Sequence, residues 1–200
     1  MSSVFEFVAN KREEVGKSVA KSFRRNGLVP AVIYGGKAEP QLLSLNHNEV
    51  IKHLSHEAVY SHVLNINVDG KIESAVLKDV QREPAGVKIL HLDFLRVNMS
   101  QPVRVHVPLH FINEEKSVGV KKGGVATHSL VDVEVLSLPA NLPDYVEVDL
   151  AGLDVGQSLH LSDLKLPEGV HVVALSQGVE HNLPVVSILA SRASKEDLAG

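Results

Sequence analysis

The chain has 200 residues, 44% of them hydrophobic, and a formal net charge of −4 at pH 7. This size suits one large β domain or two domains of about a hundred residues each. The absence of cysteine excludes disulfide frameworks, thiolate zinc sites and cysteine nucleophiles. No apolar run approaches the roughly 18 residues of a membrane helix, and the start lacks the order of a secretory signal. We therefore expect a soluble cytoplasmic protein with no membrane partner.

The charges of the two halves have opposite signs. Residues 1–96 contain 13 Lys and Arg against 11 Asp and Glu, whereas residues 97–200 contain 7 against 13. The basic residues of the first half gather in one short stretch, at Lys11, Arg12, Lys17, Lys21, Arg24 and Arg25. A local patch of this kind binds phosphate even when the whole protein is acidic.

The first elements of the chain are predicted to be a strand, a short helix and a second strand. Loose alternation of hydrophobic and polar residues predicts the first strand over residues 3–10. Residues 17–26 then read as an amphipathic helix that Gly27 ends. A buried strand over residues 31–34 follows, before a pair of glycines.

A second helix and three long strands complete the first half. Asn46, followed three residues later by Glu49, indicates a helix N-terminus of the capping-box type. Strands are predicted over residues 60–68 and 71–81, and Asp69-Gly70 between them is typical of a type I′ hairpin turn. In a third strand, residues 88–97, we expect Leu90, Leu92 and Phe94 to face the core.

Pro102 and the change in charge place a domain boundary near residue 97. We therefore divide the chain into domains at residues 1–97 and 98–190 and a flexible tail at residues 191–200. In the second domain, alternation predicts a strand over residues 103–111, and further β segments are expected at residues 130–138, 145–150 and 169–175. Residues 119–124 are expected to form a mobile loop. The predicted fold class is mainly β with short helices.

Two groups of side chains are candidates for nucleic-acid contact. At 100° per residue, Lys17, Lys21 and Arg24 form one cationic ridge of the first helix. Such a ridge contacts successive phosphates, although a solvated helix face is the ordinary alternative. His91 and Asp93 emerge on one side of their strand, where they suit base edges and 2′-hydroxyls. A purely structural hydrogen-bonded pair remains the alternative for these two.

No catalytic, cofactor or metal site is predicted. The 11 histidines include pairs with spacings that suit a shared metal, but no third ligand lies near them in the sequence. His56 begins a stretch that departs from the HExxH zinc motif because Tyr60 replaces the second histidine. There is no phosphate-binding loop, dinucleotide fingerprint or nucleophile elbow.

Four stretches together resemble the large ribosomal subunit protein twenty-five family, in its longer two-domain Ctc form, a general stress protein. They are GKSVAKSFRRNGLVPAVIYGG, VYSHVLNINVDGK, KDVQREP and KILHLDFLRV. The most specific are the Arg-x-x-Gly-x-x-Pro-Ala-x-x-Tyr-Gly block from Arg24 to Gly35 and the later His-x-Asp-Phe. This resemblance covers residues 4–98, and residues 102–190 have the length and β content of the family's second domain.

The resemblance implies an N-terminal β-barrel, similar to the anticodon-binding barrels of glutaminyl-tRNA synthetase, followed by a β-rich domain. It also implies binding to loop E of 5S rRNA, largely in the minor groove, within the 50S subunit and beside other ribosomal proteins, but not to DNA. The residues that match the family's RNA-facing surface are Arg12, Lys17, Lys21, Arg24, Tyr34, Lys78, His91 and Asp93. Ser22 and Glu83 depart from the family's pattern and lower the local positive charge.

Three alternatives to this function stay open. The first is a module that binds another structured RNA such as tRNA, because the barrel type is shared. The second is a histidine-dependent hydrolase, and the third is an interaction module that binds no RNA. The acidic second domain is expected to make few RNA contacts and to face protein neighbours.

Overall fold

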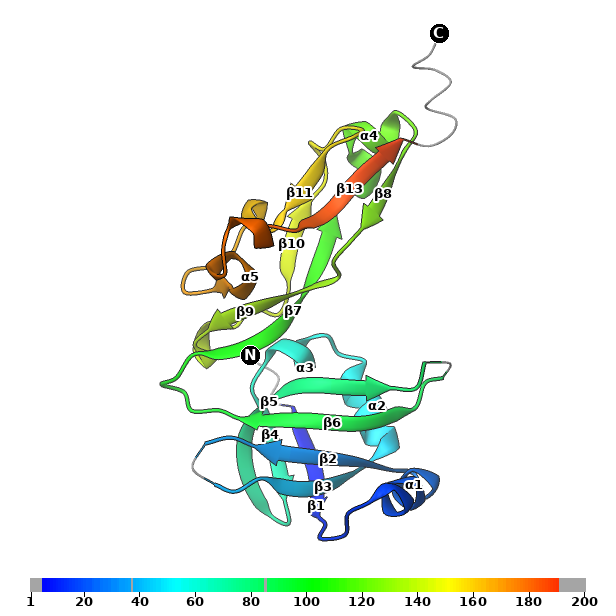
Figure 1. The fold of residues 1–200 in the computed structure, drawn as a ribbon, viewed down its shortest axis with the longest axis vertical. Helices are drawn as coiled ribbons and strands as arrows, with labels where there is room; N and C mark the ends of the chain where they lie inside the picture. Colours follow the sequence, from blue (N-terminus) through cyan, green and yellow to red (C-terminus); the bar gives the residue numbers. More distant parts are fainter. Residues whose placement is uncertain (1–4, 37, 85, 191–200) are drawn as a thin grey trace. The chain divides into compact units, whose positions relative to one another are not determined.

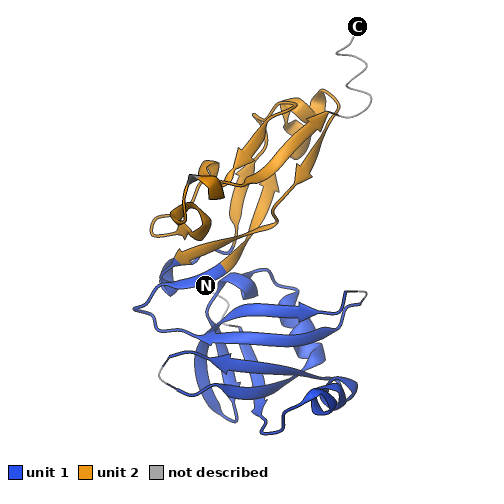
Figure 2. Ribbon diagram, in the orientation of Figure 1, with its two compact units in different colours: residues 1–105, 137–144 blue, residues 106–136, 145–200 orange. Residues whose placement is uncertain are grey.

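The computed structural model describes residues 5–36, 38–84 and 86–190. The chain divides into two compact units (Figure 2). The barrel unit comprises residues 1–105 and 137–144, and the C-terminal unit comprises residues 106–136 and 145–200. The predicted flexible tail, residues 191–200, lies outside the described residues. The sequence-based division at residue 97 stays a prediction about which parts fold independently.

The barrel unit is a closed barrel of mainly antiparallel strands, in the order β1-β3-β2-β6-β5-β4 (Figure 1). Parallel pairing of β1 with β4 closes it, and β2 and β6 form the other parallel pair. The small N-terminal β-barrel predicted by the resemblance is therefore confirmed. Its strands are β1 (Glu6–Lys11), β2 (Leu28–Tyr34), β3 (Gln41–Asn46), β4 (Leu64–Val68), β5 (Lys71–Arg82) and β6 (Ile89–Arg96).

Inward-facing apolar side chains fill the barrel. The ring centroids of Phe7 and Phe94 lie 5.7 Å apart, and both side chains are buried. Helices α2 (His47–Leu54) and α3 (Ala58–Ser61) add Val50, Leu54 and Val59 to the same core. In β1, β4 and β6 these residues alternate with less buried ones, so each of these strands keeps an outward face with polar side chains, such as Asn65 and Asn67 in β4 and His91 and Asp93 in β6. That outward face is the surface open to a partner.

Two local predictions in the barrel unit are confirmed. Asn46 caps α2, and its side-chain oxygen accepts hydrogen bonds from the main-chain nitrogens of Asn48 and Glu49. Asp69 and Gly70 both have positive φ, at 49° and 90°, as a type I′ turn requires between β4 and β5.

Two predictions in the barrel unit are wrong, and one strand is missed. The sequence predicts no element at β3, although Leu43 and Leu45 alternate with Ser44 there. The strand expected from Tyr60 begins only at Leu64, because residues 58–61 form α3. Leu90 is half-buried and Ile89 occupies the core instead, because a bulge in β6 shifts the alternation by one residue.

A partly buried ion pair fixes the end of β6. The Arg96 guanidinium donates from Nε to Oε2 of Glu73 at 2.6 Å and from Nη1 to the Glu39 main-chain oxygen at 3.1 Å. Burial acts to raise the pKa of Glu73, but hydrogen bonds from Arg96 and Lys71 outweigh it and lower that pKa overall. The pair therefore ties β5, β6 and the β2–β3 connection together.

The C-terminal unit is built on two sheets, with strand orders β10-β7-β9-β12 and β11-β13-β8. It is β-rich, as the sequence predicted, and no helix among the described residues is long and apolar enough to cross a membrane. The expected β segments at residues 103–111, 130–138, 145–150 and 169–175 correspond to β7, β9, β10 and β12. The strands are β7 (Val103–Ile112), β8 (Gly124–His128), β9 (Asp132–Ser137), β10 (Val146–Asp149), β11 (Ser158–His160), β12 (His171–Val172) and β13 (Pro184–Ala190).

Short helices connect the strands of the second half, and two predictions fail there. Residues 173–176 form α5 instead of continuing a strand. The expected loop at residues 119–124 is instead α4 followed by the start of β8. The sequence also missed β8, β11 and β13. The helices are η1 (Glu114–Lys116), α4 (Val118–Lys121), η2 (Pro139–Asn141), η3 (Leu161–Asp163), α5 (Val173–Ser176) and η4 (Val179–His181).

Gly119 allows close packing of the backbone. The glycines of residues 119–124 suggest a mobile loop, but at Gly119 the glycine serves this packing instead. A Cβ at Gly119 would lie 2.7 Å from the main-chain nitrogen of Val155 and 2.8 Å from the Asp154 carbonyl carbon. Its own main-chain nitrogen donates to the Leu153 oxygen at 2.9 Å. The glycine thus marks a tight contact and not mobility.

We predict that Gly119→Ala destabilises the C-terminal unit by about 2 kcal/mol, because backbone must move to admit the methyl group. Gly152→Ala is the matched control, since a Cβ there has no neighbour within 4 Å. Urea unfolding followed by the NMR signals of Tyr145 measures the difference. Equal midpoints for the two variants would show that the contact at Gly119 is not tight.

Candidate nucleic-acid interface

Helix α1 (Lys17–Arg25) displays the predicted cationic ridge. Lys17, Lys21 and Arg24 are all exposed, and neither lysine forms an ion pair within the described part of the chain. The apolar face is only half-buried, and Val19 and Phe23 line a hollow of about 350 Å³ together with polar residues of the helix. Polar contacts therefore add to this partial apolar packing in holding the helix on the barrel.

Arg12 supplies contacts at the start of the helix. Its Nε donates to the Leu43 main-chain oxygen at 3.0 Å, and its Nη1 donates to that of Glu14 at 2.9 Å. The guanidinium carbon lies 6.0 Å from the centre of the Phe23 ring, a distance at the limit of a cation–π contact. Burial lowers the pKa of Arg12. Arg12, predicted as an RNA contact, thus also positions α1 on the barrel.

Arg24 links the end of the ridge to strand β6. Its Nε donates to the main-chain oxygen of Leu90 at 3.0 Å. Leu90 is the extra residue of the β6 bulge, since Ile89 pairs with Arg82 and His91 pairs with Gln81. A bulged residue lies outside the regular ladder, so its carbonyl is open to a side chain. No hydrogen bond of Nη1 or Nη2 of Arg24 occurs within the described residues.

His91 and Asp93 share the outer face of β6, as the sequence predicted. Nδ1 of His91 lies 2.6 Å from Oδ1 of Asp93, and both side chains keep access to solvent, at 23% and 30% of their full exposure. On β5, Gln81 stands opposite His91 and Asp79 stands opposite Asp93. The result is a polar face with two neighbouring carboxylates.

Tyr34 belongs to this polar face. It ends β2, which pairs with β6 so that Tyr34 stands opposite Leu95. Burial, followed by the charges of Asp93 and Asp79, raises the pKa of the Tyr34 hydroxyl. The hydroxyl therefore stays protonated at neutral pH and can donate one hydrogen bond.

Lys78 is directed toward a different part of the barrel unit. It is the extra residue of a second bulge, in β5 between Leu77 and Asp79. Its ammonium lies 3.5 Å from the main-chain oxygen of Arg104. The Lys78 ammonium therefore lies beside Arg104, whereas Arg24 contacts β6 next to His91.

A basic groove that the sequence reasoning missed lies beside Arg24. Its volume is about 410 Å³, and it is lined by Arg24, Arg25, His47 and Lys88 among others. His47 Nε2 accepts a hydrogen bond from the Ile89 main-chain nitrogen at 3.2 Å. Arg25 was within the basic stretch noted from sequence. Lys88 and His47 could not be assigned to this groove from the sequence, because contacts between distant segments of the chain bring them together.

The surface combines two kinds of chemistry. The ridge on α1 offers point charges for phosphates, and the face of β6, β5 and β2 offers acceptors and donors for base edges and sugars. Among the described residues, no group of three or more His, Cys, Asp or Glu could hold a metal ion. This arrangement suits reading of a groove and does not resemble an assembled active site.

Comparison with known proteins gives two family matches that cover most of the chain. Residues 7–94 match the ribosomal L25p family, and residues 102–192 match the C-terminal domain of ribosomal protein TL5. The large ribosomal subunit protein bL25 of Methylococcus capsulatus is 56% identical over 98% of this chain and 96% of its own length. The bL25 proteins of Cellvibrio japonicus and Hahella chejuensis are 49% and 48% identical, over 100% of this chain and 99% and 97% of their own lengths.

We predict that Arg12→Met loosens α1 without unfolding the barrel, because two hydrogen bonds and the contact with Phe23 are lost at a cost of about 1 kcal/mol. Hydrogen exchange of the α1 amides should become faster, whereas amides of β4 and β5 should not change. Arg25→Met is the control, since its side chain makes no hydrogen bond with other described residues. Equal exchange in both variants would contradict the role assigned to Arg12.

Proposed function

Because the chain belongs to the ribosomal L25p family, in the long form with a TL5-type C-terminal domain, we propose that it binds the loop E region of 5S rRNA. It is a protein of the large ribosomal subunit and works in translation as part of a ribonucleoprotein. The family consists of structural ribosomal proteins, so the proposed role is to hold RNA and not to catalyse a reaction.

The hydrogen bond from Arg24 to Leu90 is the observation that carries the proposal. It brings the last cation of the ridge next to His91, the first residue of the polar face. A ridge that meets a polar face at its end fits a groove edge, where phosphates border the exposed bases. The two candidate groups found in the sequence thereby become one surface.

The proposed target is an RNA minor groove. In A-form RNA this groove is wide and shallow and exposes 2′-hydroxyls and base edges, whereas the deep major groove is closed to side chains. Lys17, Lys21 and the free end of Arg24 contact phosphates. Asp93 accepts from an exocyclic amino group, and His91 and Tyr34 contact 2′-hydroxyls or base edges. The proposal does not extend to DNA, because the minor groove of B-form DNA is only about 6 Å wide.

The two carboxylates of the polar face act in selection. Asp79 and Asp93 would repel a phosphate, so the backbone is excluded from this part of the surface. A base amino group, in contrast, donates to a carboxylate. The face therefore favours a groove over a single strand, whose backbone is free to lie anywhere.

The remaining parts of the proposal concern Arg12, Lys78 and the second half of the chain. Arg12 is proposed to contact RNA, as the resemblance implies, and its hydrogen bonds and its contact with Phe23 also position α1. Lys78 contributes positive charge at the margin. The acidic second half, residues 98–190 in our division, makes few contacts with RNA, because its charge repels phosphate.

A tRNA-like target is the second candidate, and the shared barrel type favours it. The charge pattern does not separate the two RNAs, since both present phosphates and A-form helices. A gel-shift comparison of 5S rRNA with tRNA at the same salt concentration separates them. The proposal expects tighter binding to 5S rRNA, and equal or tighter binding to tRNA would contradict it.

We predict that Lys21→Ala and Arg24→Ala each weaken binding to a loop E hairpin and reduce the slope of log K against log salt by about 1. Each variant loses one phosphate contact, and Arg24→Ala also loses the hydrogen bond to the Leu90 carbonyl that links the ridge to β6, so Arg24→Ala should weaken binding more than Lys21→Ala. Lys121→Ala in α4 is the control, because it changes the net charge equally at an exposed position of the C-terminal unit. Unchanged affinity and slope in both ridge variants would refute the assignment of the ridge.

A further inference from the structure

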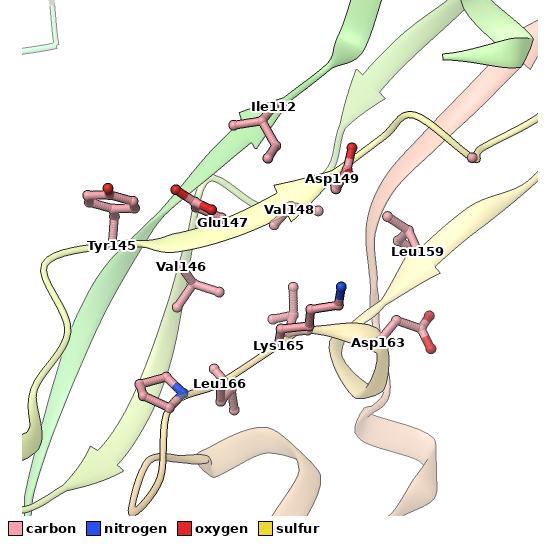
Figure 3. A pocket seen from close by; sticks show the side chains of 13 residues that line it. Ile112, Tyr145, Val146, Glu147, Val148, Asp149, Leu159, Asp163, Lys165 and Leu166 are labelled. Atoms are coloured by element: carbon pink, nitrogen blue, oxygen red, sulfur yellow. The ribbon is translucent and has the colours of Figure 1, made fainter. Parts of the chain in front are cut away.

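A groove in the C-terminal unit lies beside an outer strand of its sheet (Figure 3). Its volume is about 770 Å³. Strand β10 forms one wall, and the segment with Lys165 and Leu166 lies across from it. Leu164 and Pro167 also line the groove. Val146 and Val148 add buried apolar surface to the floor. The groove is not part of the proposed RNA surface, because that surface belongs to the barrel unit.

Strand β10 has a free edge. It is the outermost strand of its sheet, and within residues 5–36, 38–84 and 86–190 it pairs with β7 alone. The main-chain nitrogen of Leu150, directly after β10, donates to Ile112 at the end of β7. Because main-chain groups alternate between the two edges with a period of two, those of Glu147 and Asp149 point to the open edge. An open edge is a template for another strand.

The groove is acidic. Residues 145–190 contain six Asp and Glu against one basic residue, Lys165. Glu147, Asp149 and Asp163 line the groove, and Glu147 has no hydrogen bond or ion pair within the described residues. A hydrogen bond from the Ala151 main chain and one from Asn113 lower the pKa of Asp149, so this side chain stays charged in neutral solution.

The two faces of the open edge differ in chemistry. The side chains of Val146 and Val148 are buried on one face of β10, and those of Glu147 and Asp149 are exposed on the other. A strand added to this edge would therefore place alternate side chains against apolar surface and against carboxylates. Four residues of β10 offer about 13 Å for such pairing.

We propose that this groove binds an extended basic segment of another protein, in which apolar residues alternate with Lys or Arg, as an added strand along β10. The main chain of the segment pairs with Glu147 and Asp149. Its basic side chains lie beside those two carboxylates, and its apolar side chains face Val146, Val148 and Leu166. This is recognition by strand addition, with charge and side-chain pockets giving selectivity.

RNA is the less suitable occupant of the groove. Three carboxylates surround the edge and only one lysine opposes them, so a phosphate backbone is repelled. A free strand edge also offers regularly spaced main-chain donors and acceptors, which a polypeptide matches in register and a nucleotide chain does not.

The test uses the full chain and a synthetic peptide that alternates lysine and valine. We expect saturable binding by fluorescence anisotropy, together with slower hydrogen exchange at the Glu147 and Asp149 amides. A peptide of the same composition with its lysines grouped at one end should bind less tightly. Equal binding of both peptides would overturn strand addition, as would a single-stranded RNA that binds this groove more tightly than the alternating peptide.

Variants at Glu147 separate charge from main-chain pairing. Glu147→Lys should weaken binding by about tenfold or more, because like charges then oppose each other. Glu180→Lys, an exposed position that does not line the groove, should leave it unchanged. Glu147→Pro and Glu147→Gln both remove the charge, but only proline removes the open-edge donor, so weaker binding to the proline variant is expected. Unchanged binding to Glu147→Lys, or equal binding to the proline and glutamine variants, would overturn the proposal.

Discussion

The hydrogen bond from the Arg24 guanidinium to the Leu90 carbonyl joins the two halves of the proposed RNA surface. It exists because β6 bulges at Leu90 and turns a carbonyl out of the ladder. Helix α1 has no fully buried residue, so this bond and the contacts of Arg12 add to the packing of its half-buried apolar face in positioning the cationic ridge. Closure of the barrel in turn holds β6 between β2 and β5, and this pairing fixes the position of the Leu90 carbonyl.

The chain separates two kinds of recognition by charge. The barrel unit concentrates its cations on one helix and keeps carboxylates on the neighbouring sheet face, so that phosphates and base edges meet different surfaces. The C-terminal unit is acidic and has an open strand edge, which suits a basic polypeptide. A net charge of −4 for the whole chain conceals this division. Charge counted along the sequence, and not in total, is what indicates a nucleic-acid binder of this type.

Local signals in the sequence predicted the parts of the fold that depend on near neighbours. The period of α1, the Asn46 cap and the Asp69-Gly70 turn each follow from a few adjacent residues, and the pairing of His91 with Asp93 follows from strand alternation. The bulges at Leu90 and Lys78 could not be predicted from adjacent residues, because a bulge is set by pairing between distant strands. The wrong loop prediction at Gly119 has the same cause, since glycine is required there by close contact with the distant residues Asp154 and Val155. The basic groove with His47 and Lys88 also needs the folded barrel to exist.

Chemical-shift mapping of the isotope-labelled full chain, titrated with a loop E hairpin of 5S rRNA, tests the central claim most directly. The account predicts that the largest changes fall in α1 and on the outer face of β6, at Lys21, Arg24, His91 and Asp93. It also predicts that the amides of β10 do not change, because the acidic groove takes no part in RNA binding. Changes confined to the C-terminal unit, or spread over barrel strands that exclude α1 and β6, would contradict it.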